Sequence, residues 1–166
     1  MPLAHIVTPN QFEAELLTGR PVRSVAEALE ACESLHGLGP HTVIITSLEV
    51  DTDEGYLSLV GSTRLAQEGG CPQRFLLRMP KLEKPSYFTG AGDLTAALIL
   101  GRVEEGKRLS EAVELAIASV QAVLKRTAEA ATAPGAPAGP AAVELRLIQS
   151  AAEIVRPEVV HRVVKL

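Results

Sequence analysis

The chain has 166 residues, of which 46% are hydrophobic and 22% are charged, and because a chain of this length buries about 70% of its unfolded surface, one globular unit is expected. A formal net charge of −4 and 3% aromatic residues argue against nucleic-acid binding, which uses basic patches and stacking rings. No apolar run reaches the ~18 residues of a membrane span, and the first ten residues lack the basic and apolar regions of a signal peptide, so we expect a cytoplasmic protein without a membrane partner.

The first predicted elements are a short strand, a short helix, a longer helix and a buried strand. Residues 3–7 (LAHIV) form an apolar run that ends at a Thr-Pro pair, which is typical of a strand. After a short helix, Ser24 and Glu27 have the spacing of a capping box ahead of an amphipathic segment, which predicts a second helix. Residues 42–46 (TVIIT) are a continuous β-branched run of the kind found in parallel sheets.

The middle of the chain predicts a hairpin and two helices. Residues 55–62 (GYLSLVGS) and 74–79 (RFLLRM) favour two strands joined by a turn at Gly69 and Gly70. A helix is expected from Gly92 or Asp93 to about Arg102, and Ser110 is expected to cap a longer helix that ends at Thr127.

The last part of the chain changes composition. Residues 128–142 are rich in Ala, Pro and Gly, which predicts a flexible surface loop because such a segment cannot bury a core. Residues 143–150 (VELRLIQS) alternate polar and apolar residues and favour a final strand. The order of elements therefore predicts an α/β fold with a largely parallel sheet, where ligands gather at the carboxyl ends of strands.

The segment TGAGDL places Asp93 directly after two glycines and before an apolar helical run. Gly90 and Gly92 let the backbone approach a ligand, and a helix N-terminus offers unpaired amides to a phosphate. A carboxylate beside such a site can accept the proton of an attacking hydroxyl in phosphoryl transfer. The alternative is that Asp93 is a helix N-cap, and for this tetrapeptide alone the alternative is favoured about two to one because Asp is among the preferred N-cap residues.

A second group of candidate residues lies near the ends of two predicted strands. Asn10 and Glu13 stand three residues apart just after the first strand, where an amide and a carboxylate can organise a hydrated Mg²⁺ beside phosphates. Glu13 alone would be a solvated surface residue. Thr46 and Ser47 end the second strand and offer hydroxyl groups to phosphate at the ligand-binding edge of an α/β sheet.

These segments, TPNQFE, VIITS and GAGD, occur in an order that resembles the carboxyl-terminal half of the ribokinase-like small-molecule kinases. The pyridoxal kinases are the most similar, and the resemblance covers nearly the whole chain. It implies that residues 1–166 are a single carboxyl-terminal, ATP-binding part of a ribokinase-like domain, a partial three-layer sandwich with a mostly parallel sheet.

The resemblance also implies roles for the Gly-rich segment. Asp93 would be the base that activates the substrate hydroxymethyl group, and the amides of Gly90, Ala91 and Gly92 would form the anion hole for the γ-phosphate. Ala91 departs from the Thr that pyridoxal kinases typically carry, although Ala is usual in the wider superfamily. The backbone anion hole survives that change.

The resemblance further implies ATP, Mg²⁺ and a monovalent cation, K⁺ or Na⁺, as cofactors. Asn10 and Glu13 would serve the nucleotide phosphates and Mg²⁺ through water, and Thr8 with Thr46 would help to hold the monovalent cation. The remaining nucleotide-binding positions are, by the same resemblance, Thr46, Ser47, Phe88 and Thr89.

The function expected from this resemblance is ATP-dependent phosphorylation of pyridoxal to pyridoxal 5′-phosphate. Full kinases of this kind have a comparable amino-terminal half that carries the vitamin pocket, so we expect the isolated chain to lack turnover. One alternative is a catalytically silent fragment that binds nucleotide, forms a homodimer or pairs with a longer kinase subunit. Another is a related kinase that acts on hydroxymethylpyrimidine or a sugar.

Overall fold

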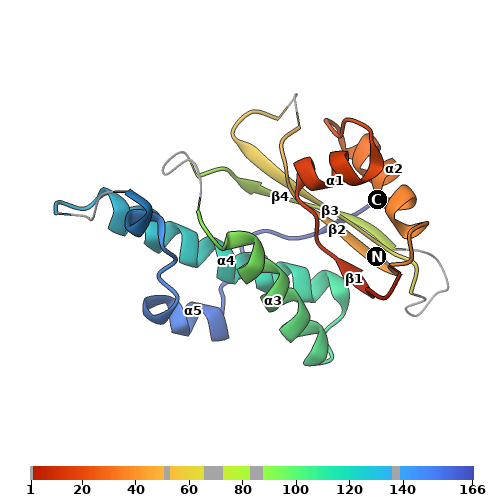
Figure 1. Cartoon of the computed structure of the whole chain (residues 1–166). Helices are drawn as coiled ribbons and strands as arrows, with labels where there is room; N and C mark the ends of the chain where they lie inside the picture. The colour runs from red at the N-terminus through yellow and green to blue at the C-terminus, as the bar shows by residue number, and fades with distance from the viewer. Residues whose placement is uncertain (1, 51–52, 66–72, 83–87, 136–138) are drawn as a thin grey trace. The chain divides into compact units, whose positions relative to one another are not determined.

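The computed structural model describes residues 2–50, 53–65, 73–82, 88–135 and 139–166. The chain forms two compact units, the first made of Met1–Lys81 with Arg162–Leu166 and the second of Leu82–His161. Figure 1 gives the order of their helices and strands along the chain.

The first unit is built on a five-stranded sheet with the strand order β1-β2-β3-β4-β5. Its strands are β1 (Ile6–Val7), β2 (Thr42–Leu48), β3 (Tyr56–Thr63), β4 (Gln73–Pro80) and β5 (Val164–Lys165). The predicted α/β class is confirmed, but the predicted mostly parallel sheet is wrong, because only β1 and β2 pair in parallel and the other three pairings are antiparallel. Residues 49–55 link β2 to β3 directly, and parallel neighbours need a crossover of about a dozen residues or more.

The predicted hairpin is confirmed by β3 and β4, which pair from Tyr56 opposite Pro80 to Thr63 opposite Gln73. The turn expected at Gly69 and Gly70 lies outside the described residues. Within the hairpin, the ring of Phe75 lies over its cross-strand partner Gly61, and a Cβ atom added to Gly61 would be 2.1 Å from Cζ of that ring. This fit helps to fix the register, because a one-residue slip would set the ring against a side chain.

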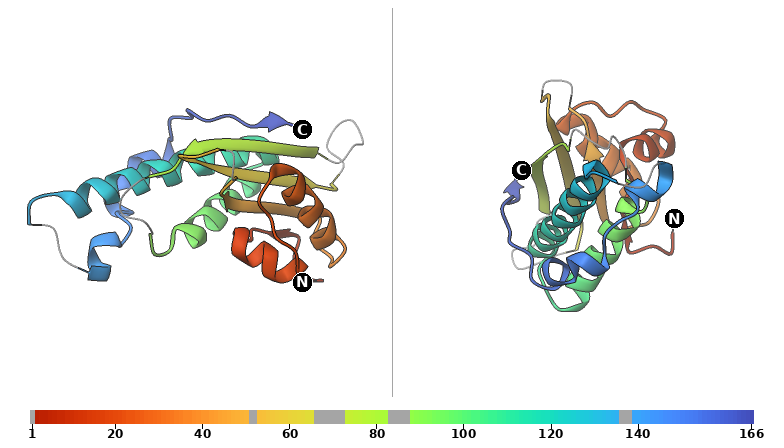
Figure 2. Two further views of the ribbon diagram at one scale, coloured as in Figure 1. Left: turned by 90° about the horizontal axis from the view of Figure 1, so that it is seen from above. Right: turned by 90° about the vertical axis from the view of Figure 1, so that its left-hand side faces the viewer.

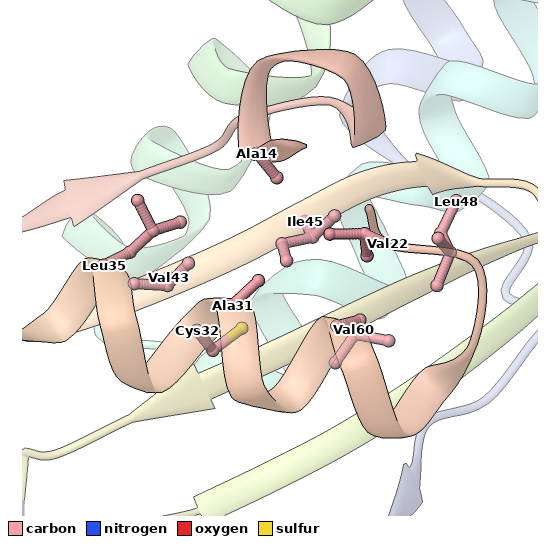
Figure 3. Packing of buried hydrophobic residues seen from close by; sticks show 10 residues of the cluster. Ala14, Val22, Ala31, Cys32, Leu35, Val43, Ile45, Leu48 and Val60 are labelled. Carbon is pink, nitrogen blue, oxygen red and sulfur yellow. The ribbon is translucent and has the colours of Figure 1, made fainter. Parts of the chain in front are cut away.

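Two helices, α1 (Gln11–Thr18) and α2 (Val25–His36), pack on the sheet of the first unit. The predicted cap of α2 is confirmed, since the amide of Glu27 donates to Oγ of Ser24 at 3.2 Å. Figure 3 shows the core that results, in which side chains of both helices and Val22 meet those of β2 and β3. Its members are Ala14, Val22, Ala28, Ala31, Cys32, Leu35, Val43, Ile45, Leu48 and Val60.

The described residues of the second unit form three α-helices, α3 (Ala91–Glu104), α4 (Leu109–Thr132) and α5 (Ala151–Val155). Two short 3-10 turns, η1 (Gly139–Val143) and η2 (Ile148–Ser150), follow α4. Both views in Figure 2 show α3 running beside α4. In the described part of the chain no helix has the length and apolar character that crossing a bilayer requires.

The long helix α4 differs from its prediction at both ends. Its N-cap is Arg108 rather than Ser110, so Ser110 lies inside the first turn. At the other end α4 continues past Thr127 to Thr132, because the intervening residues are mostly Ala and Glu, which favour helix. The first residues of the expected loop at 128–142 are therefore helical.

The strand expected at residues 143–150 is also wrong. Val143 ends the turn η1 and Ile148–Ser150 form η2. Only Glu144 takes part in strand-like pairing, as an isolated parallel bridge with Thr89. The apolar residues of this segment do not share one buried side, because Val143 is buried whereas Leu147 and Ile148 are 42% and 89% exposed.

Candidate functional site

The predicted site residues fall into two groups, one in each unit. The first unit holds Thr8, Asn10, Glu13, Thr46 and Ser47, which lie around the ends of β1 and β2 and the start of α1. The second unit holds Phe88, Thr89, Gly90, Ala91, Gly92 and Asp93, which lead into α3.

The start of α3 exposes a set of backbone donors. Gly90 is the N-cap with φ +84°, a left-handed conformation that favours glycine. The first bond of the helix runs from the amide of Leu94 to the carbonyl of Gly90 at 2.9 Å. The amides of residues 91–93 precede that bond and have no acceptor inside the helix, and the helix dipole adds partial positive charge there. Such an end is suited to an anion.

The space in front of this turn is open. A Cβ atom added to Gly92 would meet no heavy atom within 4 Å. Asp93 is exposed and stands in the first turn of α3. The alternative reading of Asp93 as the N-cap is wrong, because Gly90 occupies that position and the cap has no side-chain hydrogen bond. The carboxylate is therefore not used in capping.

In the first unit, Asn10 and Glu13 form a reciprocal capping box at the start of α1. The amide of Glu13 donates to Oδ1 of Asn10 at 2.8 Å, and the amide of Asn10 donates to Oε2 of Glu13 at 2.9 Å. The sequence analysis missed this role, although the Asn-x-x-Glu spacing matches the template recognised at Ser24 and Glu27. A carboxylate has about four acceptor sites, so the cap leaves capacity for a hydrated cation.

The end of β2 lies next to the start of α1. Thr46 and Asn10 pair as an isolated parallel bridge, and the amide of Thr46 donates to the carbonyl of Pro9 at 2.9 Å. Ser47 follows with φ +53° and is the one residue other than glycine with positive φ in the described ranges. Strained backbone of this kind is concentrated at ligand sites. The structure thus brings Asn10, Thr46 and Ser47 together.

A shallow depression of about 310 Å³ lies at this place, lined by Asn10, Gln11, Phe12, Glu15 and Ser47. A second depression of about 370 Å³ has Thr8 and Glu13 in its lining, among apolar residues of β1 and α1. The sequence analysis also missed Gln11, whose Oε1 accepts from the amide of Glu49 at 3.0 Å and whose Nε2 donates to the carbonyl of Val22 at 2.7 Å. No local signal in the sequence indicates these long-range bonds.

The metal chemistry of this group is limited to one carboxylate. Among the described residues, no three His, Cys, Asp or Glu side chains come together as a metal site. Mg²⁺ is commonly held by one or two carboxylates together with waters and substrate phosphates. Glu13, with one oxygen engaged by the cap, fits that kind of site and does not fit a protein-only cage.

Comparison with known proteins assigns this arrangement to a family. Residues 1–141, which include every predicted site residue, match the family described as phosphomethylpyrimidine kinase. The chain belongs to the phosphomethylpyrimidine kinase family. It is 42% identical over 160 residues to the pyridoxal kinase of Arabidopsis thaliana, a match that covers 96% of this chain and 50% of that protein.

Solved structures of pyridoxal kinases have a fold similar to that of this phosphomethylpyrimidine kinase family member. The pyridoxal kinase of Leishmania donovani in complex with ADP superposes with a TM-score of 0.85 at 30% identity, covering 98% of this chain and 52% of that one. The same kinase in complex with ADP and pyridoxamine gives a TM-score of 0.83 at 29% identity, over 98% and 52% of the two chains. The chain spans about half the length of the relatives it matches.

Proposed function

We propose that this chain provides the nucleotide-phosphate-binding part of an ATP-dependent pyridoxal kinase. The observation that carries the proposal is the left-handed turn at Gly90, which opens α3 with unpaired amides one residue ahead of Asp93. The similarity to pyridoxal kinases along 96% of the chain supports it. The reaction transfers the γ-phosphoryl group of ATP to the hydroxymethyl oxygen of pyridoxal, and gives pyridoxal 5′-phosphate and ADP.

In this proposal the start of α3 performs the transfer chemistry. The amides of Gly90, Ala91 and Gly92 stabilise charge on the transferring phosphoryl group, as preorganised donors do for a developing anion. The exposed carboxylate of Asp93 accepts the proton of the attacking hydroxyl group. General-base catalysis of this kind contributes about 100-fold to 10,000-fold to a rate.

The residues near β1 and β2 serve the nucleotide and its cations. Glu13, assisted by Asn10, holds a hydrated Mg²⁺ whose charge neutralises the phosphates. Thr46 and Ser47 donate hydroxyl hydrogen bonds to phosphate oxygens, and Thr8 with Thr46 contributes oxygen ligands to K⁺ or Na⁺. Phe88 and Thr89 lie along the nucleotide. The capping box supports the Mg²⁺ role, because it holds Oε2 of Glu13 at the start of α1 and leaves the other carboxylate oxygen for a cation.

A binding and kinase assay on the chain, wild type beside Asp93→Asn, tests the proposal. Isothermal titration with Mg²⁺ and ADP is expected to give equal affinity for both proteins, since the amides remain. Formation of pyridoxal 5′-phosphate is measured with the chain alone and with a longer pyridoxal kinase subunit added. Loss of turnover by at least about 100-fold in the variant supports Asp93 as the base, whereas equal turnover removes that role and absence of ADP binding removes the proposal.

A second candidate function is a silent nucleotide-binding chain that forms a homodimer or pairs with a longer kinase subunit. The observations that favour it are the edge position of β1 and the exposure of Phe12 and Leu16, which are 70% and 72% exposed on one side of α1. Sheet edges and exposed apolar side chains are usual association surfaces. Light scattering that gives a single monomer mass for the wild type and for Phe12→Glu, with or without a longer subunit, would exclude this candidate.

The identity of the substrate that accepts the phosphoryl group is the third point to test. The resemblance to ribokinase-like kinases leaves hydroxymethylpyrimidine or a sugar as alternative substrates, and a panel of pyridoxal, pyridoxamine, hydroxymethylpyrimidine and ribose separates them. We place the activity in the cytoplasm. The buried free thiol of Cys32 fits a reducing compartment.

A further inference from the structure

The segment that follows α4 returns to the start of α3. Glu144 pairs with Thr89 as a parallel bridge, immediately before the left-handed Gly90. The next residue, Leu145, places Cδ1 3.8 Å from the position that a Cβ atom of Gly90 would occupy. Residues 143–150, here called the strap, therefore touch the turn from which the anion-binding amides project.

The strap is anchored to α4 through one buried hydroxyl group. Thr127 is fully buried, and its Oγ1 donates to the carbonyl of Val123 at 2.7 Å. The same oxygen accepts from the backbone amide of Arg146 at 3.1 Å. Arg146 is two residues beyond Glu144, so the Thr127 hydroxyl group binds the strap close to the part that contacts the turn.

The helix α5, which follows the strap, has a separate anchor. Ser119, about two turns before Thr127 on α4 and also fully buried, donates to the carbonyls of Glu153 and Ile154 at 3.1 and 3.2 Å. Arg102 near the end of α3 donates to the carbonyls of Ile154 and Val155 at 2.8 and 3.1 Å. These bonds hold α5 and involve neither the strap nor the turn at Gly90.

The turn needs such support. Gly90 carries no side chain, and the N-cap of α3 has no side-chain hydrogen bond. A helix end of this kind frays, because its first amides have no partner and glycine has the widest range of backbone conformations. A bridge from outside the helix restricts that motion.

We propose that Thr127 is a positioning residue for the anion-binding turn at residues 89–93, acting through the strap. The role of this turn in phosphate binding rests on the proposed function, whereas the effect of Thr127 on the conformation of the turn does not depend on it. Thr127 touches neither nucleotide nor substrate. Its hydroxyl group fixes Arg146, the strap fixes Thr89, and the amides of the turn are thereby held in the geometry that a phosphate requires.

The test uses Thr127→Val, which removes the hydroxyl group at nearly constant shape, and Thr127→Ser, which keeps it. Ser119→Ala is the matched control, because it removes a buried hydroxyl group of α4 that binds α5 and not the turn. Two readouts are measured for each protein. They are the hydrogen-exchange rate of the Leu94 amide, which donates to Gly90, and the Kd for ADP with Mg²⁺.

In Thr127→Val, both the hydrogen-exchange rate of the Leu94 amide and the Kd for ADP are expected to rise about 10-fold above the wild-type values. An effect of this size corresponds to the loss of about one hydrogen bond. Thr127→Ser is expected to restore both values. The exchange rate of the Glu105 amide, at the other end of α3, and both readouts in Ser119→Ala are expected to stay near wild type.

The outcomes separate this inference from the proposed function. A Thr127→Val protein with the wild-type exchange rate at Leu94 overturns the positioning role, whatever the nucleotide result. If wild type itself binds no ADP while Leu94 still exchanges faster in Thr127→Val, the proposed function fails and the strap's structural role stands. Equal effects of Thr127→Val and Ser119→Ala on Leu94 mean a general loss of stability and also overturn the inference.

Discussion

Gly92 and Gly101 provide a matched pair that separates helix stability from ligand binding on the same helix. Both lie in α3, both are exposed, and a Cβ atom at either position would meet no heavy atom within 4 Å. Replacement of Gly by Ala inside a helix stabilises it by about 0.5–1 kcal/mol when nothing collides with the methyl group. For a chain of this size that gain raises Tm by about 1–4 °C.

Gly101→Ala is therefore expected to raise Tm and leave ADP binding unchanged. Gly92→Ala is expected to be at least as stable as the wild type, but its methyl group occupies the space through which a phosphate reaches the amides at the start of α3. We expect its Kd for ADP to rise at least about 10-fold, or about 1.4 kcal/mol.

Thermal unfolding and titration with Mg²⁺ and ADP measure the two effects on the same samples. A folded Gly92→Ala protein that binds ADP as tightly as Gly101→Ala would refute the phosphate site at this turn, because a ligand on the amides cannot avoid the added methyl group. A large loss of stability in Gly92→Ala would refute the open space that the geometry indicates.

Three further predictions concern the first unit. Glu13→Gln keeps the oxygen that completes the capping box, so the free energy of unfolding should change by less than about 1 kcal/mol. A titration of this variant with ADP should show that Mg²⁺ no longer strengthens ADP binding, and an unchanged Mg²⁺ dependence would contradict the metal role of Glu13. Gly61→Ala should destabilise the chain by about 1–3 kcal/mol in urea unfolding, because the new Cβ atom would lie 2.1 Å from the Phe75 ring, and a neutral effect would contradict this packing. Burial raises the pKa of the Cys32 thiol to about 12, so in a Cys71→Ser background iodoacetamide at pH 8 should react about 1,000-fold more slowly with native than with unfolded protein. The stability due to the protonated thiol should fall as pH rises above about 9, where the unfolded thiol ionises. Similar iodoacetamide rates in the native and unfolded states would contradict this prediction.

Local signals in the sequence were sufficient for α1, α2 and α3 and for the hairpin. Ser24 and Glu27 predict a cap that the structure contains, and the glycines before Asp93 predict the start of α3 within about two residues. Each of these signals acts between residues that are close in the chain. Capping bonds, turn conformations and side-chain periodicity are set at that range, so they can be deduced without a tertiary structure.

Strand direction depends on information of longer range, and the end of α4 depends on a local balance between residues that favour helix and the proline that follows them. The β-branched run at 42–46 has the composition of a parallel strand, yet β2 pairs in parallel on one side and antiparallel on the other. A mixed environment gives the same buried run, because both faces are covered in either case. At residues 128–132 the expectation of a loop came from the prolines and glycines that follow, whereas Ala and Glu extend the helix until Pro134 approaches.

The grouping of Asn10 with Thr46 shows how a site can follow from strand register. β1 and β2 pair in parallel with Ile6 opposite Thr42 and Val7 opposite Val43, and the bridge between Asn10 and Thr46 keeps the same offset. Two parallel neighbours that start level also end level, so the residues after their last buried positions must meet at one edge. The composition of the two segments predicts both strands, but it does not fix their register. The backbone conformation of Ser47 is a second feature that composition leaves open. Its positive φ is a backbone conformation that composition does not predict, and it lies inside β2, in the register shift between Ile45 and Leu48 where the pairing with β3 is irregular.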